Sequence, residues 1–249
     1  MNNVTIVCPY IFEEEIKSLR KECLLLNVET IFERDDNLIG CDLMYQRLWK
    51  KASPNDIIIL HSDMSFVEGA EDWLNSFLSY VNKYKKAGIF GCKLLYPIKN
   101  KYNKYYIQCA GGKFTNNKPD HFGSGIELIS KNIFKEPEID EGQYDFVREV
   151  AWTTFGGIYI RREVLDQVGD FDAHFEWTYN RDVDYCLQAR KLGWKIYQLP
   201  IPLFHFESKD VKRVKTQENV AAESRNLQLL LKKWSNTDLY KTLDVKIDD

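Results

Sequence analysis

The most restrictive feature of this 249-residue sequence is the apolar run Ile-Ile-Ile-Leu at residues 57–60, which follows Asp56 and stops abruptly at His61. Successive side chains of a β-strand point to opposite faces of the sheet, so a strand that is apolar at every position is buried on both faces. Such strands are typical of parallel sheets that are covered by helices on both sides. The run therefore predicts a central parallel strand in an α/β domain.

Strand and helix patterns alternate on either side of this run. The predicted strands lie at residues 4–8, 28–32, 56–60, 88–95, 158–160 and 195–199. The predicted helices lie at residues 16–26, 43–48, 73–84, 183–187 and 220–234. This alternation predicts an open, twisted, mostly parallel sheet with flanking helices, and ligands bind beyond the carboxyl ends of the strands in sheets of this kind. Residues 96–150 lose the alternation, and we expect them to form an irregular insertion along one wall of the site.

Composition removes several classes of function. The formal net charge is −3, so the chain has no global basic field to attract nucleic acid, and we expect no nucleic-acid partner. No signal segment and no apolar stretch of about 18 residues occurs, so we expect no membrane span. The six cysteines are scattered without C-x-x-C spacing, and we interpret them as reduced core thiols of a cytosolic protein.

Acidic residues follow the predicted strands at positions where a ligand would lie. Asp63 comes just after the central strand and is expected to reach the ligand site, although it can also cap a helix. Asp182 and Asp184 begin a predicted helix, where acids are also common for dipole reasons, and only one of them can point inward. Asp35 and Asp36 end the second strand, where they can bind a base or ribose or form a turn.

Histidine and glycine add further candidates. His205 stands between two phenylalanines after a strand, where a packed core histidine is the more common role. Two glycine pairs, Gly111-Gly112 and Gly156-Gly157, permit close approach of the backbone to a ligand. Neither pair matches the glycine-rich motifs of dinucleotide or P-loop sites.

Taken in order, these segments resemble the family 2 glycosyltransferases, which are nucleotide-sugar enzymes with the GT-A fold. The resemblance spans residues 3–208 and is most specific in five segments: Phe155-Gly156-Gly157-Ile158-Tyr159-Ile160, Val168-Gly169-Asp170-Phe171-Asp172, Asp182-Val183-Asp184-Tyr185, Gly193-Trp194, and Pro200 with His205. Residues 107–112 and 121–123 are similar to the middle region of rhamnosyltransferase-like members. The resemblance implies a GT-A domain at 1–208, with a nucleotide-binding half at about 1–95 and an acceptor-side half at about 96–208. A C-terminal helical extension follows at 209–249.

The resemblance also implies roles for individual residues. His61-Ser62-Asp63 occupies the place of the family's D-x-D motif, so Asp63 is expected to bind Mn²⁺ or Mg²⁺, with His205 as a further ligand. Asp182 matches the family's general base. The residues expected to bind substrate are Pro9, Tyr10, Asp35, Asp36, His61, Ser62, Gly111, Gly112, Trp152, Gly156, Gly157 and Arg181. The basic residues Lys209, Lys212, Arg213 and Lys215 are expected either to clamp the diphosphate or to form a solvated face.

Two residues depart from the family's pattern. His61 replaces the first D-x-D acid, which leaves the metal preference open or directs the imidazole to the nucleotide. Arg181 replaces a glutamate before Asp182, so we expect it to lower the pKa of Asp182 if the two are close. Such a change would either weaken the base or favour an anionic acceptor.

The resulting hypothesis is a metal-dependent, inverting glycosyltransferase that moves a sugar from a nucleoside-diphosphate donor to a hydroxyl of a glycan or lipid-linked acceptor. The family resemblance implies bacterial surface polysaccharide synthesis, in the cytoplasm or at the inner face of the membrane. The amphipathic C-terminal helix is expected to pack within the chain or to form a homodimer. The alternatives are a catalytically silent nucleotide-sugar or glycan-binding module, and a nucleotidyltransferase, which would need a glycine-rich basic loop that the N-terminus lacks.

Overall fold

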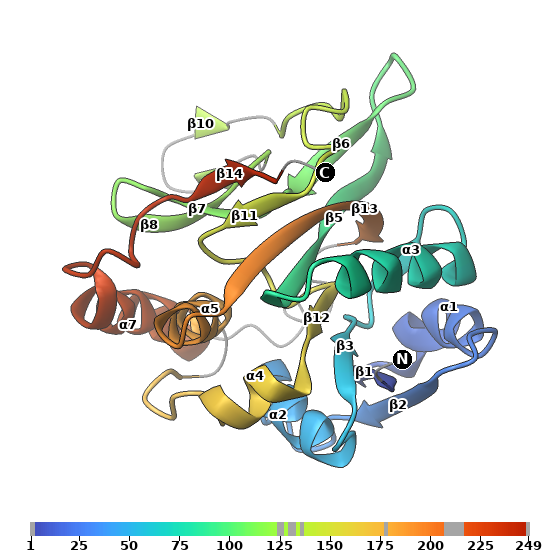
Figure 1. Cartoon of the computed structure of the whole chain (residues 1–249), viewed down its shortest axis with the longest axis horizontal. Coiled ribbons are helices and arrows are strands. Elements are labelled where there is room, and N and C mark those ends of the chain that lie inside the picture. The colour runs from blue at the N-terminus through green and yellow to red at the C-terminus, as the bar shows by residue number, and fades with distance from the viewer. Residues whose placement is uncertain are drawn as a thin grey trace.

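The core of the protein is a ten-stranded mixed sheet with the strand order β14-β11-β13-β5-β12-β3-β1-β2 along its main path, as Figure 1 shows. The computed structural model describes residues 3–123, 127–128, 133–134, 137–176, 179–206 and 217–247. The strands of the main path are β1 (Val4–Tyr10), β2 (Glu29–Arg34), β3 (Asp56–Ile59), β5 (Ala87–Lys99), β11 (Arg148–Val150), β12 (Ile158–Ile160), β13 (Lys195–His205) and β14 (Asp244–Lys246). Two further strands leave that path: β4 (Met64–Phe66) pairs with β13, and β6 (Tyr105–Cys109) pairs with β5.

Parallel strand pairs lie in the central part of the sheet, as the sequence predicts. β1 lies parallel to both β2 and β3, and β5 lies parallel to β13. β12 runs antiparallel between β3 and β5, and β4, β6, β11 and β14 also pair antiparallel with their neighbours. An apolar run of three residues gives no signal for strand direction, so the sequence predicts the strand but not its reversal. The mostly parallel α/β class is confirmed.

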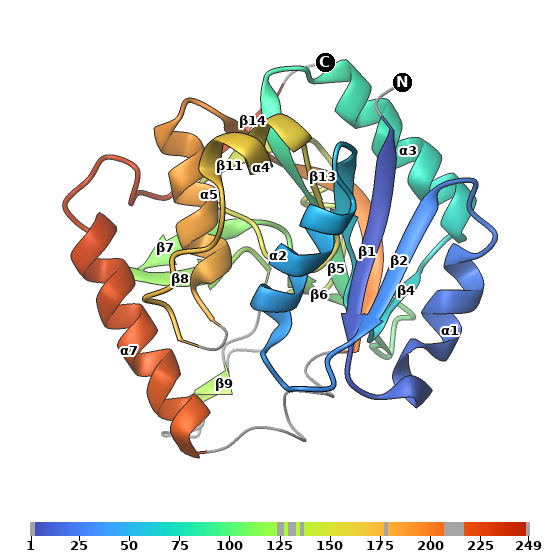
Figure 2. The ribbon, with the colours of Figure 1, turned by 90° about the horizontal axis from the view of Figure 1, so that it is seen from below.

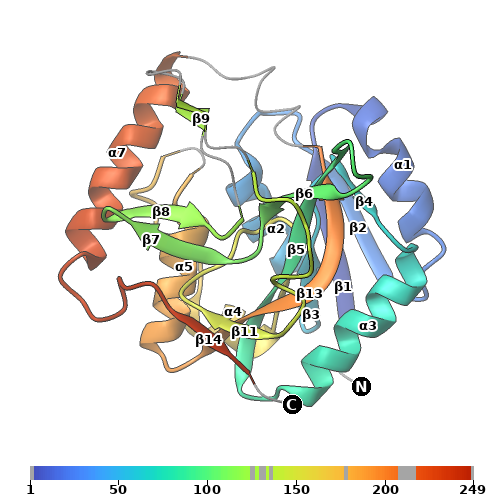
Figure 3. The same ribbon diagram turned by 90° about the horizontal axis from the view of Figure 1, so that it is seen from above.

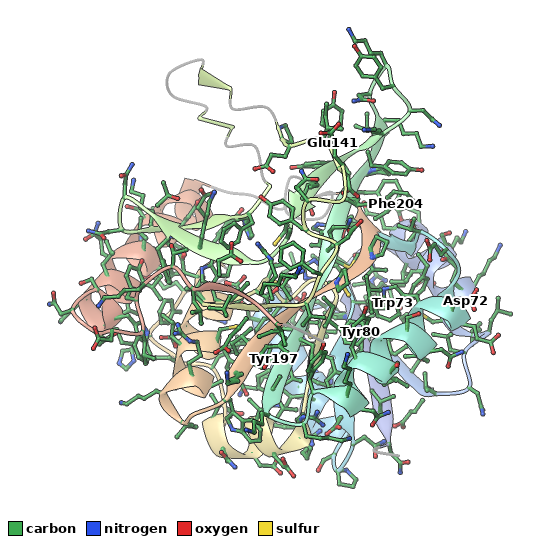
Figure 4. The ribbon with its side chains drawn as sticks, turned by 45° about the horizontal axis from the view of Figure 1, so that its top comes forward. Asp72, Trp73, Tyr80, Glu141, Tyr197 and Phe204 are labelled. Carbon is green, nitrogen blue, oxygen red and sulfur yellow. The ribbon has the colours of Figure 1, made fainter. Side chains whose placement is uncertain are left out.

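Helices cover both faces of the sheet because β3 sends alternate side chains to opposite sides. Ile58 and Leu60 join the core formed with α1 (Glu13–Cys23) and α3 (Ala70–Lys83). Ile57 and Ile59 join the core on the other face, against α2 (Cys41–Lys51), α4 (Arg162–Val168), α5 (Arg181–Lys191) and α7 (Gln217–Trp234). Figure 2 shows the two helical layers. Figure 4 labels Trp73 and Tyr80 on α3, close to the strand that carries Tyr197.

The segment at 96–150 forms strands that the sequence pattern does not predict. β6 folds back antiparallel onto β5, and a hairpin of β7 (Gly112–Thr115) and β8 (Lys118–His121) follows. Two-residue strands β9 (Glu127–Leu128) and β10 (Ile133–Phe134) pair with each other. Figure 3 shows the β7–β8 hairpin beside the C-terminal part of the chain. Thr242 Oγ1 donates a hydrogen bond of 3.0 Å to the carbonyl of Phe114 there.

The C-terminal part of the chain packs onto the same sheet and its helices. Trp234 of α7 donates its indole N–H to Asp184 Oδ1 over 2.6 Å, and Lys233 Nζ lies 2.9 Å from the same oxygen. β14 extends the sheet by pairing antiparallel with β11. The amphipathic face of α7 is therefore buried within its own chain, which is one of the two arrangements that the sequence leaves open.

The six cysteines behave as buried thiols. None forms a disulfide, and all except the partly exposed Cys41 are buried. Burial raises the pKa of Cys109 and of Cys186 to about 12. Both thiols therefore stay protonated at neutral pH.

Replacing Trp234 with Phe keeps the ring in the core but removes the hydrogen bond to the buried Asp184 carboxylate. A hydrogen bond to a charged group contributes about 1.5–3 kcal/mol, so we expect the free energy of unfolding to fall by that amount in urea titrations. Trp194→Phe is the matched control, because the indole N–H of Trp194 donates to Gln167 at the surface. An equal loss in both variants would contradict the anchoring role of the Trp234 bond.

Candidate active site

Three side chains with metal-binding atoms meet where β3 and β13 end. His61 follows β3, Asp63 directly precedes β4, and His205 is the last residue of β13. β4 pairs antiparallel with β13 in a register that places His205 opposite Met64, so the histidine lies next to Asp63. The amide N–H of Phe206 donates to the carbonyl of Asp63 over 2.9 Å and fixes the two segments together.

The ligating atoms of these three residues all lie within 4.8 Å of one another. His61 Nδ1 is 3.3 Å from His205 Nε2, and His205 Nε2 is 3.2 Å from Asp63 Oδ1. The side chains of Asp63 and His205 are largely buried. Two imidazole nitrogens and one carboxylate oxygen thus converge on one small volume, so the sequence-predicted Asp63 and His205 lie together and His61 joins them.

Gln108 of β6 sets the orientation of His205. Its Oε1 lies 2.5 Å from His205 Nδ1, and an amide oxygen can only accept a hydrogen bond. In the neutral ring the proton therefore sits on Nδ1, and the lone pair of Nε2 points toward Asp63 and His61. Residues that orient metal-ligating histidines in this way raise metal affinity. The sequence gives no signal for Gln108, because only the pairing of β6 with β5 brings it to the site.

His61 is held as a neutral imidazole. Its pKa is lowered to about 4, chiefly by burial and also by the neighbouring His205, while the charge of Asp63 acts in the opposite direction. The ring stacks on Tyr45 of α2, with 6.0 Å between ring centroids and 7° between ring planes. A neutral, rigidly packed imidazole is the form that binds a metal ion.

The donor set favours Mn²⁺ over Mg²⁺. Mg²⁺ prefers oxygen ligands in strict octahedral geometry, whereas imidazole nitrogen suits transition metals. The three ligating atoms come from His61, Asp63 and His205. The residues present therefore fit a divalent transition metal.

Asp182 and Asp184 have different environments at the start of α5. Asp184 is buried, and its carboxylate accepts a hydrogen bond from Trp234 and forms an ion pair with Lys233, both of α7. Asp182 keeps part of its surface exposed, yet the protein surrounds it closely enough that burial raises its pKa to about 6. Asp182 is therefore able to exchange a proton near neutral pH.

Arg181 does not act on Asp182 as the sequence predicts. Its Nη2 donates to the carbonyl of Phe175, and its Nη1 lies 3.8 Å from Asp42 Oδ2. The guanidinium therefore faces Asp42 of α2, and the expectation of a lowered pKa for Asp182 is wrong. Helical geometry explains the difference, because adjacent residues of a helix point in directions about 100° apart.

Asp42 is a buried acid beside Arg181 that the sequence analysis does not single out. It lies in the first turn of α2, and its pKa is raised to about 7, chiefly by burial, with the charge of Arg181 acting in the opposite direction. An acid in the first turn of a helix is usually explained by the helix dipole. One feature of the sequence could have indicated its burial. Asp42 lies one turn before Tyr45 and on the same face of α2 as Trp49, and this face is buried.

The predicted nucleotide-side residues lie at the ends of β1 and β2. The amide N–H of Asp35 donates to the carbonyl of Tyr10 over 2.8 Å. The Asp35 carboxylate accepts hydrogen bonds of 3.0 Å from the amides of Ile39 and Gly40, which makes it a turn-forming group. Asp36 is exposed and lies 3.4 Å from Arg34. Pro9 is buried at the end of β1.

The glycine pairs divide between the site and the core. Gly156 lies beside His61, since a Cβ atom there would be 3.2 Å from the ring, and Ser62 next to that histidine is buried. Gly157 has φ of +69° and packs on Leu203. Close approach of backbone to side chain is therefore used at Gly156 near the metal-binding atoms.

The second glycine pair packs against buried residues. Gly111 has φ of +97° and faces Val150, and a Cβ on Gly112 would lie 2.2 Å from the ring of Trp152. Trp152 is buried and donates its indole N–H to the carbonyl of Lys113 over 3.1 Å. Its position explains why Gly112 must be a glycine. The basic residues Lys209, Lys212, Arg213 and Lys215 lie outside the described residues.

Comparison with solved structures identifies the fold. The structure of GalNAc-T7 with UDP, GalNAc and Mn²⁺ superposes with a TM-score of 0.61 at 11% identity, over 95% of this chain and 48% of that chain. The mannosyltransferase PcManGT from Pyrobaculum calidifontis, in complex with GDP-Man and Mn²⁺, gives a TM-score of 0.55 at 11% identity, over 93% and 64%. The chain has the GT-A glycosyltransferase fold. It spans about half the length of the first structure and less than two thirds of the second.

Sequence comparison finds no relative. No family model matches the chain, and no curated protein matches it. At 11% identity the structural likeness extends to the fold alone.

Replacing Gln108 with Leu removes the acceptor that fixes the His205 tautomer while keeping a side chain of similar size. Loss of such an orienting partner typically costs about 10–100-fold in metal affinity, so we expect the dissociation constant for Mn²⁺ to rise by that factor in calorimetric titrations. Gln143→Leu is the control, because Gln143 is an exposed residue of the 96–150 segment. Unchanged Mn²⁺ affinity in the Gln108 variant would exclude the orienting role.

Proposed function

We propose that this protein is a metal-dependent, inverting glycosyltransferase that moves a sugar from a nucleoside-diphosphate donor to an acceptor hydroxyl. The observation that carries the proposal is the convergence of His61, Asp63 and His205 within 4.8 Å at the ends of β3 and β13 of a GT-A fold. In open α/β sheets, ligands bind at the carboxyl ends of the strands, which is where these three residues lie. The two solved structures described above hold Mn²⁺ together with a nucleotide.

His61, Asp63 and His205 would hold the ion. A divalent ion bound there would neutralise charge that develops on the departing diphosphate. His61 is a neutral imidazole, and a histidine carries no negative charge in either of its usual forms. Asp63 therefore supplies the only formal negative charge among the three ligands. The ligand set therefore offsets one of the two positive charges, and the other remains available to the diphosphate.

Asp182 serves as the general base in this proposal. A base is effective when its pKa lies near the working pH, and burial raises the pKa of Asp182 to about 6. Above that pH the carboxylate is ionised and can accept the proton of the attacking hydroxyl. The hydroxyl attacks the anomeric carbon from the side opposite the diphosphate, so a single displacement inverts the configuration.

We further propose a glycan or lipid-linked acceptor and a role in surface polysaccharide synthesis, at the cytoplasmic side of a membrane. The resemblance of the sequence motifs to family 2 glycosyltransferases, and to their rhamnosyltransferase-like members, is what supports these assignments. Within the part of the chain that the structure describes, no helix is both long and apolar enough to span a membrane.

Removing a metal ligand tests the metal site. We expect thermal-shift assays of the wild-type protein to find one nucleoside diphosphate among UDP, GDP, ADP and dTDP that stabilises it in the presence of Mn²⁺. Asp63→Ala and His205→Ala should abolish that Mn²⁺-dependent shift, while Asp72→Ala, which changes an exposed acid of α3, should retain it. A full shift in the Asp63 variant would rule out the metal assignment.

Asp182→Asn tests the base. The amide cannot accept the proton, so we expect the rate of sugar transfer to fall by about 100-fold or more while donor affinity stays within about twofold. For the wild type, log kcat/KM should rise with unit slope up to about pH 6 and then level off, because Asp182 loses its proton there. Donor binding without transfer or hydrolysis in the wild type would instead indicate a binding module.

A further inference from the structure

The hairpin between β5 and β6 projects from the end of the sheet that carries the candidate metal site. β5 runs parallel to β13, and Leu95 of β5 lies opposite Phe204, the residue before His205. The ring of Tyr105 in β6 packs edge-on against Phe204, with 4.8 Å between the ring centroids. β5 then continues to Lys99, so the hairpin reaches about 13 Å past the level of Phe204 at about 3.3 Å per residue. Figure 1 shows it extending beyond the neighbouring strands.

The tip of this hairpin, residues 98–104, is a turn organised by Asn100. The side-chain oxygen of Asn100 accepts hydrogen bonds from the amides of Tyr102 and Lys104, over 2.9 Å and 3.1 Å. The Asn100 amide donates to the carbonyl of Lys104 over 2.8 Å, and the Asn100 carbonyl accepts from the amide of Asn103 over 3.0 Å. The tip therefore holds its side chains in one arrangement before it meets any partner.

Two large apolar side chains are exposed on the tip. Ile98 is 62% exposed and Tyr102 is 68% exposed. A single exposed apolar residue is ordinary, but here two stand together at the end of a projecting turn. Tyrosine is enriched at membrane–water interfaces, because its ring is apolar and its hydroxyl is polar. The pair therefore suits a surface that is apolar below and polar above.

The tip also concentrates positive charge, although the whole chain has a net charge of −3. Lys99, Lys101 and Lys104 are all exposed. Lys104 Nζ lies 2.9 Å from Glu141, and Figure 4 labels Glu141 near the hairpin. Lys99 and Lys101 form no ion pair in the described part of the chain, and each lies over a tyrosine ring of the hairpin instead. The tip thus offers two unneutralised positive charges beside its two apolar side chains.

The acids at the base of the hairpin are held away from the tip. Asp140 and Asp145 both pair with the buried Lys93, which lies six positions before Lys99 on β5. Glu138 accepts a hydrogen bond of 3.1 Å from the hydroxyl of Tyr144. Charge therefore separates along the hairpin, with lysines at the tip and acids behind it. An anionic surface would attract the tip first, and salt screens the more distant acids more strongly.

We propose that this tip docks on an anionic lipid bilayer, with Ile98 and Tyr102 in the interface and Lys99 and Lys101 at the anionic headgroups. Apolar burial and electrostatic attraction add to each other in binding of this kind. Because the tip and the candidate metal site stand at the same end of the sheet, docking turns the site toward the lipid surface. This orientation rests on the proposed function, since a lipid-linked acceptor would present its hydroxyl there.

Vesicle flotation with the full chain tests the proposal. We expect the wild type to bind phosphatidylcholine vesicles that contain about 30% phosphatidylglycerol more tightly than pure phosphatidylcholine vesicles. Lys99→Gln/Lys101→Gln should lower the affinity for the anionic vesicles by about 25-fold, since each lysine near such a surface contributes about fivefold. Ile98→Ser/Tyr102→Ser should lower it by about tenfold or more. Added salt should weaken the wild type more than the lysine double variant.

Two double variants elsewhere on the surface are the matched controls. Lys85→Gln/Lys86→Gln removes two exposed lysines from the turn before β5. Leu24→Ser/Leu25→Ser removes two leucines that follow α1 and are 73% and 80% exposed. Both controls should keep the affinity for anionic vesicles within about twofold of the wild type.

The proposal is overturned if the wild type shows no preference for anionic vesicles, if the tip variants keep the wild-type affinity, or if either control loses as much as they do. Loss of vesicle binding in tip variants that keep the Mn²⁺-dependent nucleoside-diphosphate shift supports it, because that shift shows that the fold is intact. A wild type that gives this shift but binds no vesicles contradicts the docking proposal alone. A wild type that binds anionic vesicles through the tip but responds to no nucleoside diphosphate contradicts only the proposed function.

Discussion

The antiparallel pairing of β4 with β13 is the constraint on which the candidate metal site depends. β4 has only three residues, Met64–Phe66, yet its register brings the end of β13 alongside the loop that follows β3. His61 and Asp63 are separated from His205 by more than 140 positions in the sequence, and this pairing brings their ligating atoms within 4.8 Å. Without it, Asp63 would remain an acid on a loop and His205 a histidine at the end of a strand.

The parts of the fold that follow from local periodicity are the parts that the sequence predicts. The double-faced burial of β3, the helical stripe of α3 and the strand β13 all match their patterns. The reversed direction of β12 and the strands between 96 and 150 have no such signal, because strand direction and hairpin partners depend on contacts distant in sequence. Periodicity encodes burial, whereas topology depends on which buried faces meet.

The candidate site shows the same division. Asp63, His205 and Asp182 stand at strand or helix ends and carry side chains with obvious chemistry, so their positions indicate a role. Gln108 and Asp42 have common alternative explanations in a sequence, and only tertiary contacts distinguish them. The position of Arg181 in the sequence points to it as a candidate. The expectation that it lowers the pKa of Asp182 is wrong, because the sequence does not show in which direction a side chain leaves the helix.

Burial dominates over the helix dipole at two acids that begin helices. Asp42 and Asp182 both lie in first turns, where the dipole favours the ionised form, yet the pKa of each is raised. Ionising them therefore costs stability. The turn before α5 is held separately, because Asn226 of α7 donates to the carbonyl of Tyr179, which has φ of +67°. The C-terminal helix thus contacts a backbone conformation that a residue with a side chain rarely adopts.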